Sequence, residues 1–164
     1  MVADMKDNAE IPAPADYFKL PGAPIITLKN LTYNERLSEE TLAFAATVIF
    51  DGQKIDGSNR GTGGCNMYHA DQSLITRATE FARSVLDESF EPLDSLISEQ
   101  IERMQLLKKL RRACKTNICF IKPGDNIRTT YRTIKVADSP KNRSSILTNY
   151  PGSIILNDIV AATR

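Results

Sequence analysis

The chain has 164 residues, of which 41% are hydrophobic and 25% are charged, and its formal net charge is +1. These proportions are ordinary for a globular protein, and no apolar run approaches the ~18 residues of a membrane span. Collagen-like, disordered, disulfide-stabilised and membrane proteins are thereby excluded. The N-terminus lacks a secretory signal and the three cysteines cannot all pair within the chain, so we expect a cytoplasmic protein.

The first predicted elements are an arm and three strands. Residues 1–24 contain four prolines among Ala, Asp and Glu, a composition that disfavours helix and sheet and predicts a disordered arm. Strands are predicted at Ile25–Tyr33 and Thr41–Phe50, and the second is apolar on both faces, which is typical of a central strand. Asp51–Gly52 suits a two-residue hairpin turn, after which a third strand begins at Gln53.

Two amphipathic helices follow, over Ser73–Leu86 and from Pro92 to about Cys114. In the longer helix the apolar stripe shifts by roughly a quarter-turn near Met104, so this helix must bend or change its packing partner there. The apolar side chains after the shift, which need cover, are those of Leu106, Leu107 and Leu110. Either the segment Ile154–Val160 or a second copy of the protein provides that cover, so a homodimer is one of the two arrangements expected.

The C-terminal part of the chain is predicted to contain a second pair of strands. These strands are expected at Asn117–Lys122 and Ile127–Val136, joined by a turn at Pro123–Asn126. Ser139–Pro140 is typical of a helix N-cap followed by the first helical turn, and a last short strand is predicted at Ser153–Leu156.

Together these elements predict an α+β fold, in which an antiparallel sheet made of the N-terminal hairpin and the C-terminal β pair packs on two helices. A single domain is expected over residues 25–164. Charge is divided unevenly along the chain, with 8 Lys/Arg against 16 Asp/Glu in residues 1–100 and 13 against 4 in residues 101–164. Such a division is typical of halves that compensate each other, or of a basic surface that meets an anion or an acidic partner.

The glycine-rich stretch Gly57–Asn66 has the most unusual composition, with four glycines in eight positions. Successive backbone N–H groups in such a loop can hold a phosphate or a carboxylate, and a flexible connector is the other interpretation. The stretch lacks the lysine of a P-loop and does not lie within a βαβ unit, so it matches neither nucleotide-binding signature. The residues predicted here to bind a ligand or partner are Arg60, Gly61, Thr62, Gly63, Gly64 and Asn66.

The cysteines and the single histidine give weak signals of chemistry. The complete set is Cys65, His69, Cys114 and Cys119. A zinc site is arithmetically conceivable, but the tight Cys-x2–4-Cys spacing of structural zinc is absent, so no metal and no cofactor are predicted. Cys65 and His69 would form a nucleophile and base from neighbouring residues, whereas such dyads are usually assembled from distant segments. We therefore assign no catalytic residue and favour a binding function over an enzymatic one.

A basic face is predicted on the second half of the longer helix. Its residues follow the spacing i, i+3, i+4, i+7 and are Lys108, Arg111, Arg112 and Lys115. Further cations follow at Lys122, Arg128, Arg132 and Lys135. The helix dipole alone favours cations at this end, which is the alternative interpretation for half of the cluster. Few aromatic residues interleave with the cations, so the expected partners are an acidic protein, then a small anionic ligand, then nucleic acid.

Short motifs of the chain resemble those of a known group. Leu28–Leu31, Ser38–Thr41 and Gly63–Asn66 with Tyr68 resemble an uncharacterised group of small phage and bacterial proteins, which have a Gly-Gly-Cys-Asn loop after a β-hairpin. The resemblance implies an origin in a phage or mobile element. By analogy, it implies a non-enzymatic protein that blocks a host factor or defence system in the host cytoplasm. The glycine-rich loop and the basic helix are its expected contact surface, and binding of a small phosphorylated ligand or nucleotide is the alternative.

Overall fold

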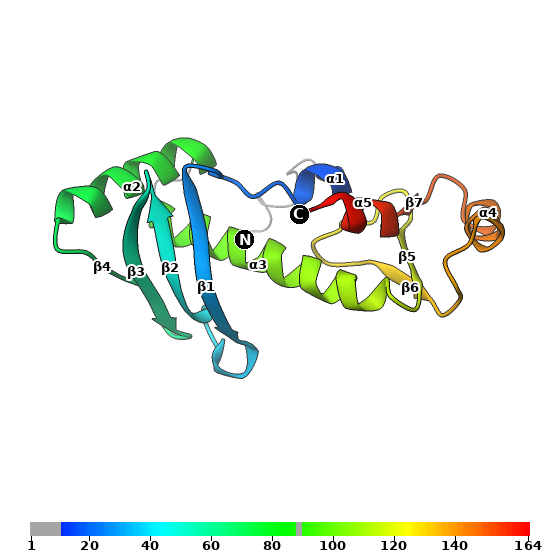
Figure 1. The fold of residues 1–164 in the computed structure, drawn as a ribbon, viewed down its shortest axis with the longest axis horizontal. Coiled ribbons are helices and arrows are strands. Elements are labelled where there is room, and N and C mark those ends of the chain that lie inside the picture. The colour runs from blue at the N-terminus through cyan, green and yellow to red at the C-terminus, as the bar shows by residue number, and fades with distance from the viewer. Residues whose placement is uncertain (1–10, 88–89) are drawn as a thin grey trace, which may run out of the picture. The chain divides into compact units, whose positions relative to one another are not determined.

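The computed structural model describes residues 11–87 and 90–164 (Figure 1). It forms two compact units, one over Leu20–Glu102 and the other over Arg103–Arg164 together with the residues up to Lys19. Among described residues the first unit carries 6 Lys/Arg against 12 Asp/Glu, and the second carries 14 against 4. We call them the acidic unit and the basic unit. A single domain was expected over residues 25–164, and this stays a prediction. Along α3, the predicted change of packing partner corresponds to a change from one hydrophobic core to another.

The acidic unit contains a four-stranded antiparallel sheet in the order β1-β2-β3-β4. Its strands are β1 (Ile26–Asn34), β2 (Ala43–Phe50), β3 (Gln53–Arg60) and β4 (Asn66–Tyr68), with a short 3-10 helix η1 (Glu35–Leu37) after β1. The central position predicted for the second strand is confirmed, because β2 lies between β1 and β3. Asp51 and Gly52 have φ values of 49° and 75°, the positive values that a tight hairpin turn between β2 and β3 requires.

Two helices cover one face of this sheet: α2 (Gln72–Leu86) and the first part of α3 (Pro92–Ala113) (Figure 1). Asp71 is the N-cap of α2, and its carboxylate accepts a hydrogen bond from the Ser73 backbone N–H at 2.9 Å. The core of the unit joins side chains of all these layers, including Val48, Ile55, Leu74, Leu96 and Ile97. The apolar side chains predicted from the alternation of the strands and from the helical stripes thus pack into one hydrophobic core.

The basic unit contains a three-stranded antiparallel sheet in the order β6-β5-β7. Its elements are α1 (Pro14–Tyr17), the end of α3, β5 (Ile118–Ile121), β6 (Arg132–Ile134), α4 (Pro140–Asn149), β7 (Ile154–Ile155) and α5 (Asn157–Ala162). Tyr17 and Phe18 lie within the predicted arm, yet they are only 2% and 5% exposed and belong to the core of this unit. Burial of these aromatic rings orders a segment whose proline content had predicted disorder. Residues 1–10 of that arm lie outside the described residues.

The shift of the apolar stripe along α3 corresponds to a change of core. Leu96 and Ile97 belong to the core of the acidic unit, whereas Leu107 and Leu110 belong to a core of the basic unit. That second core also contains Leu156 and Val160 from the C-terminal segment. The leucines after the shift are therefore covered within the chain, by the first of the two expected arrangements. A homodimer is not needed to cover these leucines, and it stays a prediction.

The predicted α+β class is confirmed, but the N-terminal hairpin and the C-terminal β pair belong to two separate sheets. The strand expected over Ile127–Val136 is shorter, because Asn126 starts a turn instead. Its side-chain Oδ1 accepts from the Arg128 N–H, and its carbonyl accepts from the N–H groups of Thr129 and Thr130. Over the residues that the structure describes, no helix combines the length and the apolar character needed to cross a bilayer.

Candidate functional site

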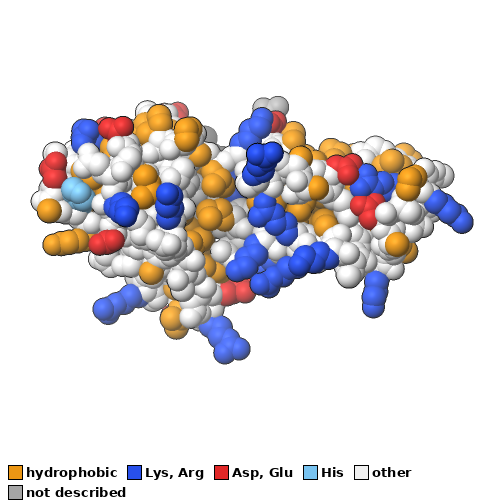
Figure 2. All heavy atoms as spheres, in the orientation of Figure 1, with side chains coloured by type: hydrophobic (Ala, Val, Ile, Leu, Met, Phe, Trp, Pro, Cys, Tyr) orange, Lys and Arg blue, Asp and Glu red, His pale blue; other side chains and the backbone are white. Residues whose placement is uncertain are grey.

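The basic helix face lies on the second half of α3, within the basic unit. Lys108, Arg112 and Lys115 are exposed, and Arg111 is also exposed while its Nη2 donates to the Thr163 carbonyl at 2.6 Å. Lys and Arg side chains gather in Figure 2 along the course that α3 takes in Figure 1. The predicted helical spacing is realised for Lys108, Arg111 and Arg112, whereas Lys115 was expected on the same helix and lies in the turn after α3.

Each side-chain carboxylate among the described residues of the basic unit takes part in an ion pair. Among its described residues these pairs are Asp16 with Lys19 (2.8 Å), Asp125 with Arg132 (3.3 Å), and Asp138 and Asp158 with Arg143 (2.5 and 2.6 Å). Lys108, Arg112 and Lys115 have no carboxylate partner among the described residues. These cations consequently present positive charge that no described carboxylate of their own unit neutralises.

The cations predicted on the following strands have contacts of a different kind. Lys122 Nζ lies 4.5 Å from the centroid of the Tyr150 ring, and Arg128 Cζ lies 5.7 Å from that of Tyr17. Arg132 pairs with Asp125. These side chains are held against their own unit, so they contribute less to a free cationic surface than the helix face does.

The glycine-rich loop of the acidic unit is ordered by the buried side chain of Asn59, which is 6% exposed. Its Oδ1 accepts hydrogen bonds from the Gly61 N–H at 2.8 Å and the Thr41 hydroxyl at 3.2 Å, and its Nδ2 donates to the Gly63 carbonyl at 3.1 Å. Gly61 has a φ of +97°, and a Cβ at this position would lie 1.7 Å from the Leu37 carbonyl oxygen. Glycine is therefore required here by the close approach of another backbone segment.

The Cys65 end of the loop is occupied by carboxylates of the same chain. The Cys65 N–H donates to Asp94 Oδ2 at 2.7 Å, and a Cβ at Gly64 would lie 3.3 Å from that oxygen and 3.6 Å from Glu91 Oε1. Burial, and then the negative charge of Asp94, raise the pKa of the Cys65 thiol to about 12. A phosphate that approached the Cys65 N–H would have to displace the Asp94 carboxylate and would be repelled by that of Glu91. At this end of the loop, the backbone N–H therefore binds a carboxylate of the same chain and stabilises the fold.

The remaining predicted residues of the loop are placed on the surface. Arg60 ends β3 and Thr62 follows it, both with exposed side chains. Gly63 has a φ of +81°, with open space where a Cβ would stand. Asn66 is exposed and starts β4, where it pairs with Ser58 of β3. This part of the loop is free for contact with a partner.

The histidine and the cysteines occupy structural positions. His69 Nδ1 accepts a hydrogen bond from the Asp71 N–H at 2.9 Å, which places the ring at the start of α2. Cys119 is fully buried, and burial together with Cys119 raises the pKa of the Cys114 thiol to about 12. Within residues 11–87 and 90–164, no three His, Cys, Asp or Glu side chains form a group that could hold a metal ion.

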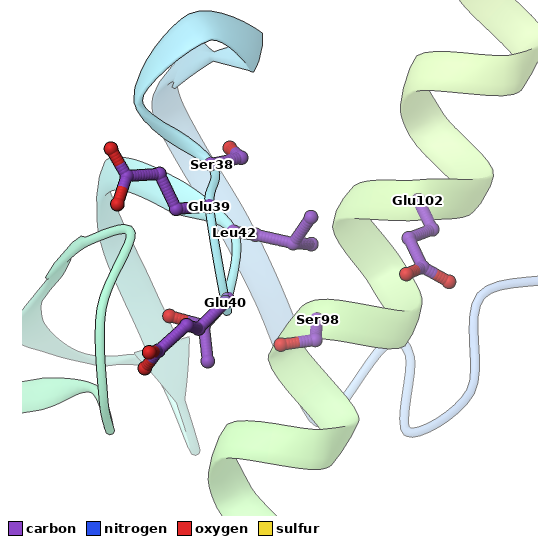
Figure 3. Close-up of a pocket in the computed structure, with 7 residues that line it drawn as sticks. Ser38, Glu39, Glu40, Leu42, Ser98 and Glu102 are labelled. Atoms are coloured by element: carbon purple, nitrogen blue, oxygen red, sulfur yellow. The ribbon is translucent and has the colours of Figure 1, made fainter.

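Figure 3 shows a shallow pocket of about 310 Å³ in the acidic unit, between the β1–β2 connection and α3. Its lining includes Glu39, Glu40 and Glu102. Glu39 and Glu40 point away from α3, so the three carboxylates do not converge on one point (Figure 3). The pocket is acidic without offering a common centre for a cation.

The two parts of the predicted contact surface fall in different units, the glycine-rich loop in the acidic unit and the helix face in the basic unit. The sequence analysis missed the cluster of Arg143 with Asp138 and Asp158, because Asp158 lies fifteen residues further along the chain and no local spacing links it to the others. Comparison of the chain with family models, curated proteins and solved structures found no match.

Proposed function

We propose that this protein acts by binding a partner with an acidic surface, and that the contact is made by the exposed cations of α3. One observation carries the proposal: every described carboxylate of the basic unit is ion-paired, while Lys108, Arg112 and Lys115 are exposed without one. A surface with such unneutralised charge attracts an anionic partner over a distance of about 10 Å at moderate salt.

An acidic protein suits this surface better than single-stranded nucleic acid. Single strands are held by aromatic rings on which bases stack, in addition to cations. None of the described aromatic side chains of the basic unit is exposed: Tyr17, Phe18 and Phe120 are buried, and Tyr131 and Tyr150 are half-buried. Tyr150 is moreover occupied by Lys122. The face thus offers charge without a stacking platform.

The resemblance of the loop motifs to small phage and bacterial proteins supports a host factor or a defence protein as the partner. A non-enzymatic binding function is supported by the raised pKa of the Cys65 thiol beside Asp94, and by the hydrogen bond that His69 accepts at the start of α2. The exposed residues Arg60, Thr62 and Asn66 of the glycine-rich loop provide a second contact region in the acidic unit.

A charge-reversal capture experiment tests the proposal. The wild type is compared in nuclease-treated host lysate with Lys108→Glu/Arg112→Glu, and with a matched control, Lys29→Glu/Lys54→Glu, which reverses two exposed cations of the acidic unit. We expect an acidic protein to bind the wild type and the control, and to lose about tenfold or more in recovery with the α3 variant. Equal recovery by all three proteins, or a partner lost on nuclease treatment alone, would contradict the proposal.

A further inference from the structure

A pocket of about 570 Å³ opens on the basic unit, in the range of roughly 300–1,000 Å³ that small-molecule sites occupy. Three elements meet there: the end of α3, the segment that precedes α4, and α5. The lining residues that matter for binding are Arg111, Lys115, Asp138, Asp158, Val160 and Ala161. Nothing in the sequence analysis assigned a site to this combination of residues.

The two carboxylates of the pocket are fixed by one guanidinium group. Arg143 donates from Nε and Nη2 to Asp138 at 2.5 and 2.7 Å, and from Nη1 and Nη2 to Asp158 at 2.6 and 2.9 Å. The hydrogen bonds and charge of Arg143 lower the pKa of both aspartates, so both are ionised at neutral pH. Each carboxylate has further lone pairs, which can accept hydrogen bonds from a ligand.

The two cations of the pocket are Arg111, near the end of α3, and Lys115, in the turn that follows this helix. Lys115 is exposed and without a carboxylate partner among the described residues, so its ammonium group is free to pair with a ligand. Arg111 uses one donor for the Thr163 carbonyl, which leaves other donors of its guanidinium group and fixes its position. Val160 and Ala161 add apolar surface to the lining.

We infer that this pocket binds a small zwitterion with an apolar side chain, of the class of α-amino acids and short peptides. The ligand carboxylate pairs with Arg111 and Lys115, and its ammonium group pairs with Asp138 and Asp158. A polyanion such as a nucleoside triphosphate is disfavoured, because it would meet the two aspartates. This site goes beyond the proposed function, although Lys115 belongs to both. The two are distinguished by Lys108 and Arg112, which belong to the proposed contact surface and do not line the pocket.

The probe for the test is the dipeptide Leu-Leu, titrated into the full-length protein while backbone amide shifts are followed by NMR. N-acetyl-Leu-Leu lacks the ammonium group, and Leu-leucinamide lacks the carboxylate. We expect Leu-Leu to shift the amides of Lys115 and of α5, and each blocked peptide to bind about tenfold more weakly. Absence of shifts at roughly 10 mM Leu-Leu, or equal binding of either blocked peptide, overturns the inference.

A variant on the exposed lysine completes the test without disturbing the fold. Lys115→Gln should weaken Leu-Leu about tenfold and leave Leu-leucinamide unchanged, because the latter has no carboxylate for Lys115 to hold. Lys108→Gln is the matched control and should change neither affinity. If Lys115→Gln weakens both peptides equally, or if inorganic phosphate binds the pocket more tightly than Leu-Leu does, the site is not one for zwitterions.

Discussion

In the acidic unit, 12 carboxylates face 6 cations among the described residues, whereas in the basic unit 4 carboxylates face 14 cations. In the acidic unit, the Asp94 carboxylate accepts a hydrogen bond from the Cys65 backbone N–H of the glycine-rich loop. The basic unit instead uses its carboxylates in ion pairs with Lys19, Arg132 and Arg143. In the basic unit, the exposed cations Lys108 and Arg112 of α3 have no carboxylate partner among the described residues and are available for binding.

The two units also differ in how their cores are built. The acidic unit has one core, in which α2 and α3 pack on a four-stranded sheet. The basic unit has two smaller cores, one around Leu107 and Leu110 and one around Ile118, Phe120 and Ile146. A fold divided in this way predicts that damage to one core acts first on its own unit.

The largest effect is expected from removing a buried leucine of α3 in either core. Leu96 and Leu110 are both fully buried, the first in the acidic unit and the second in the basic unit. Leu96→Ala and Leu110→Ala should each lower the free energy of unfolding by about 2–5 kcal/mol. Hydrogen exchange followed residue by residue should show faster exchange in β1–β3 for the first variant and in β5 for the second. Uniform acceleration over both units in either variant would instead show that the two units unfold as one cooperative fold.

The second effect concerns the glycine-rich loop of the acidic unit. Gly61→Ala should lower the free energy of unfolding by about 3 kcal/mol or more, because the new Cβ would stand 1.7 Å from the Leu37 carbonyl oxygen at a φ of +97°. Gly63→Ala is the matched control, since its φ is +81° and nothing lies within 4 Å of its Cβ, so only about 1–2 kcal/mol is expected. Urea titration of both variants measures the difference. Equal losses would mean that the loop is the flexible connector rather than an ordered part of the fold.

Much of the acidic unit could be predicted from the sequence, because its strands and helices are set by local patterns. The hairpin turn at Asp51–Gly52 and the alternation along Thr41–Phe50 depend on neighbouring residues, and the structure places β2 and β3 accordingly. In the basic unit the strands are short, and Ile118–Ile121 is buried on both faces, so its partners depend on distant residues. The hydrophobic pattern of β5 does not show that this strand pairs with β7 rather than with the N-terminal hairpin.

The candidate sites show the same contrast. The basic face of α3 was predictable, because helical spacing alone places Lys108, Arg111 and Arg112 on one side. Lys115 was expected on the same face but lies in the turn after the helix. The carboxylate that holds the glycine-rich loop was not predictable, since Asp94 lies twenty-nine residues after Cys65. The burial of Tyr17 and Phe18 was also missed, because the surrounding prolines dominate the composition of that segment.

The third prediction compares a cysteine of each unit. Burial and Asp94 raise the pKa of Cys65, and burial and Cys119 raise the pKa of Cys114, both to about 12. At pH 8 both thiols should react with iodoacetamide on the order of a hundredfold more slowly than free cysteine, because the thiolate is the reactive form. Asp94→Asn removes a negative charge beside Cys65 only, so it should accelerate labelling of Cys65 and leave Cys114 unchanged, as measured by peptide mass spectrometry. If Cys65 reacted as fast as free cysteine, the prediction would be wrong, and Cys65 would again be a candidate nucleophile.

The smallest effect is a pH dependence that belongs to the basic unit. Arg143 lowers the pKa of Asp138 and Asp158 in the folded protein, so the pairing stabilises the fold above their ordinary value of about 3.9 and is lost as the pH falls through the lowered values. Arg143→Gln should therefore be less stable than the wild type at pH 7, and the difference in melting temperature should shrink below about pH 4. Arg112→Gln is the control, because Arg112 is exposed and has no carboxylate partner among the described residues, and its pH profile should follow the wild type. A constant difference in melting temperature between Arg143→Gln and the wild type from pH 7 to pH 2 would contradict this prediction. It would show that Arg143 stabilises the fold through packing and not through its ion pairs with Asp138 and Asp158.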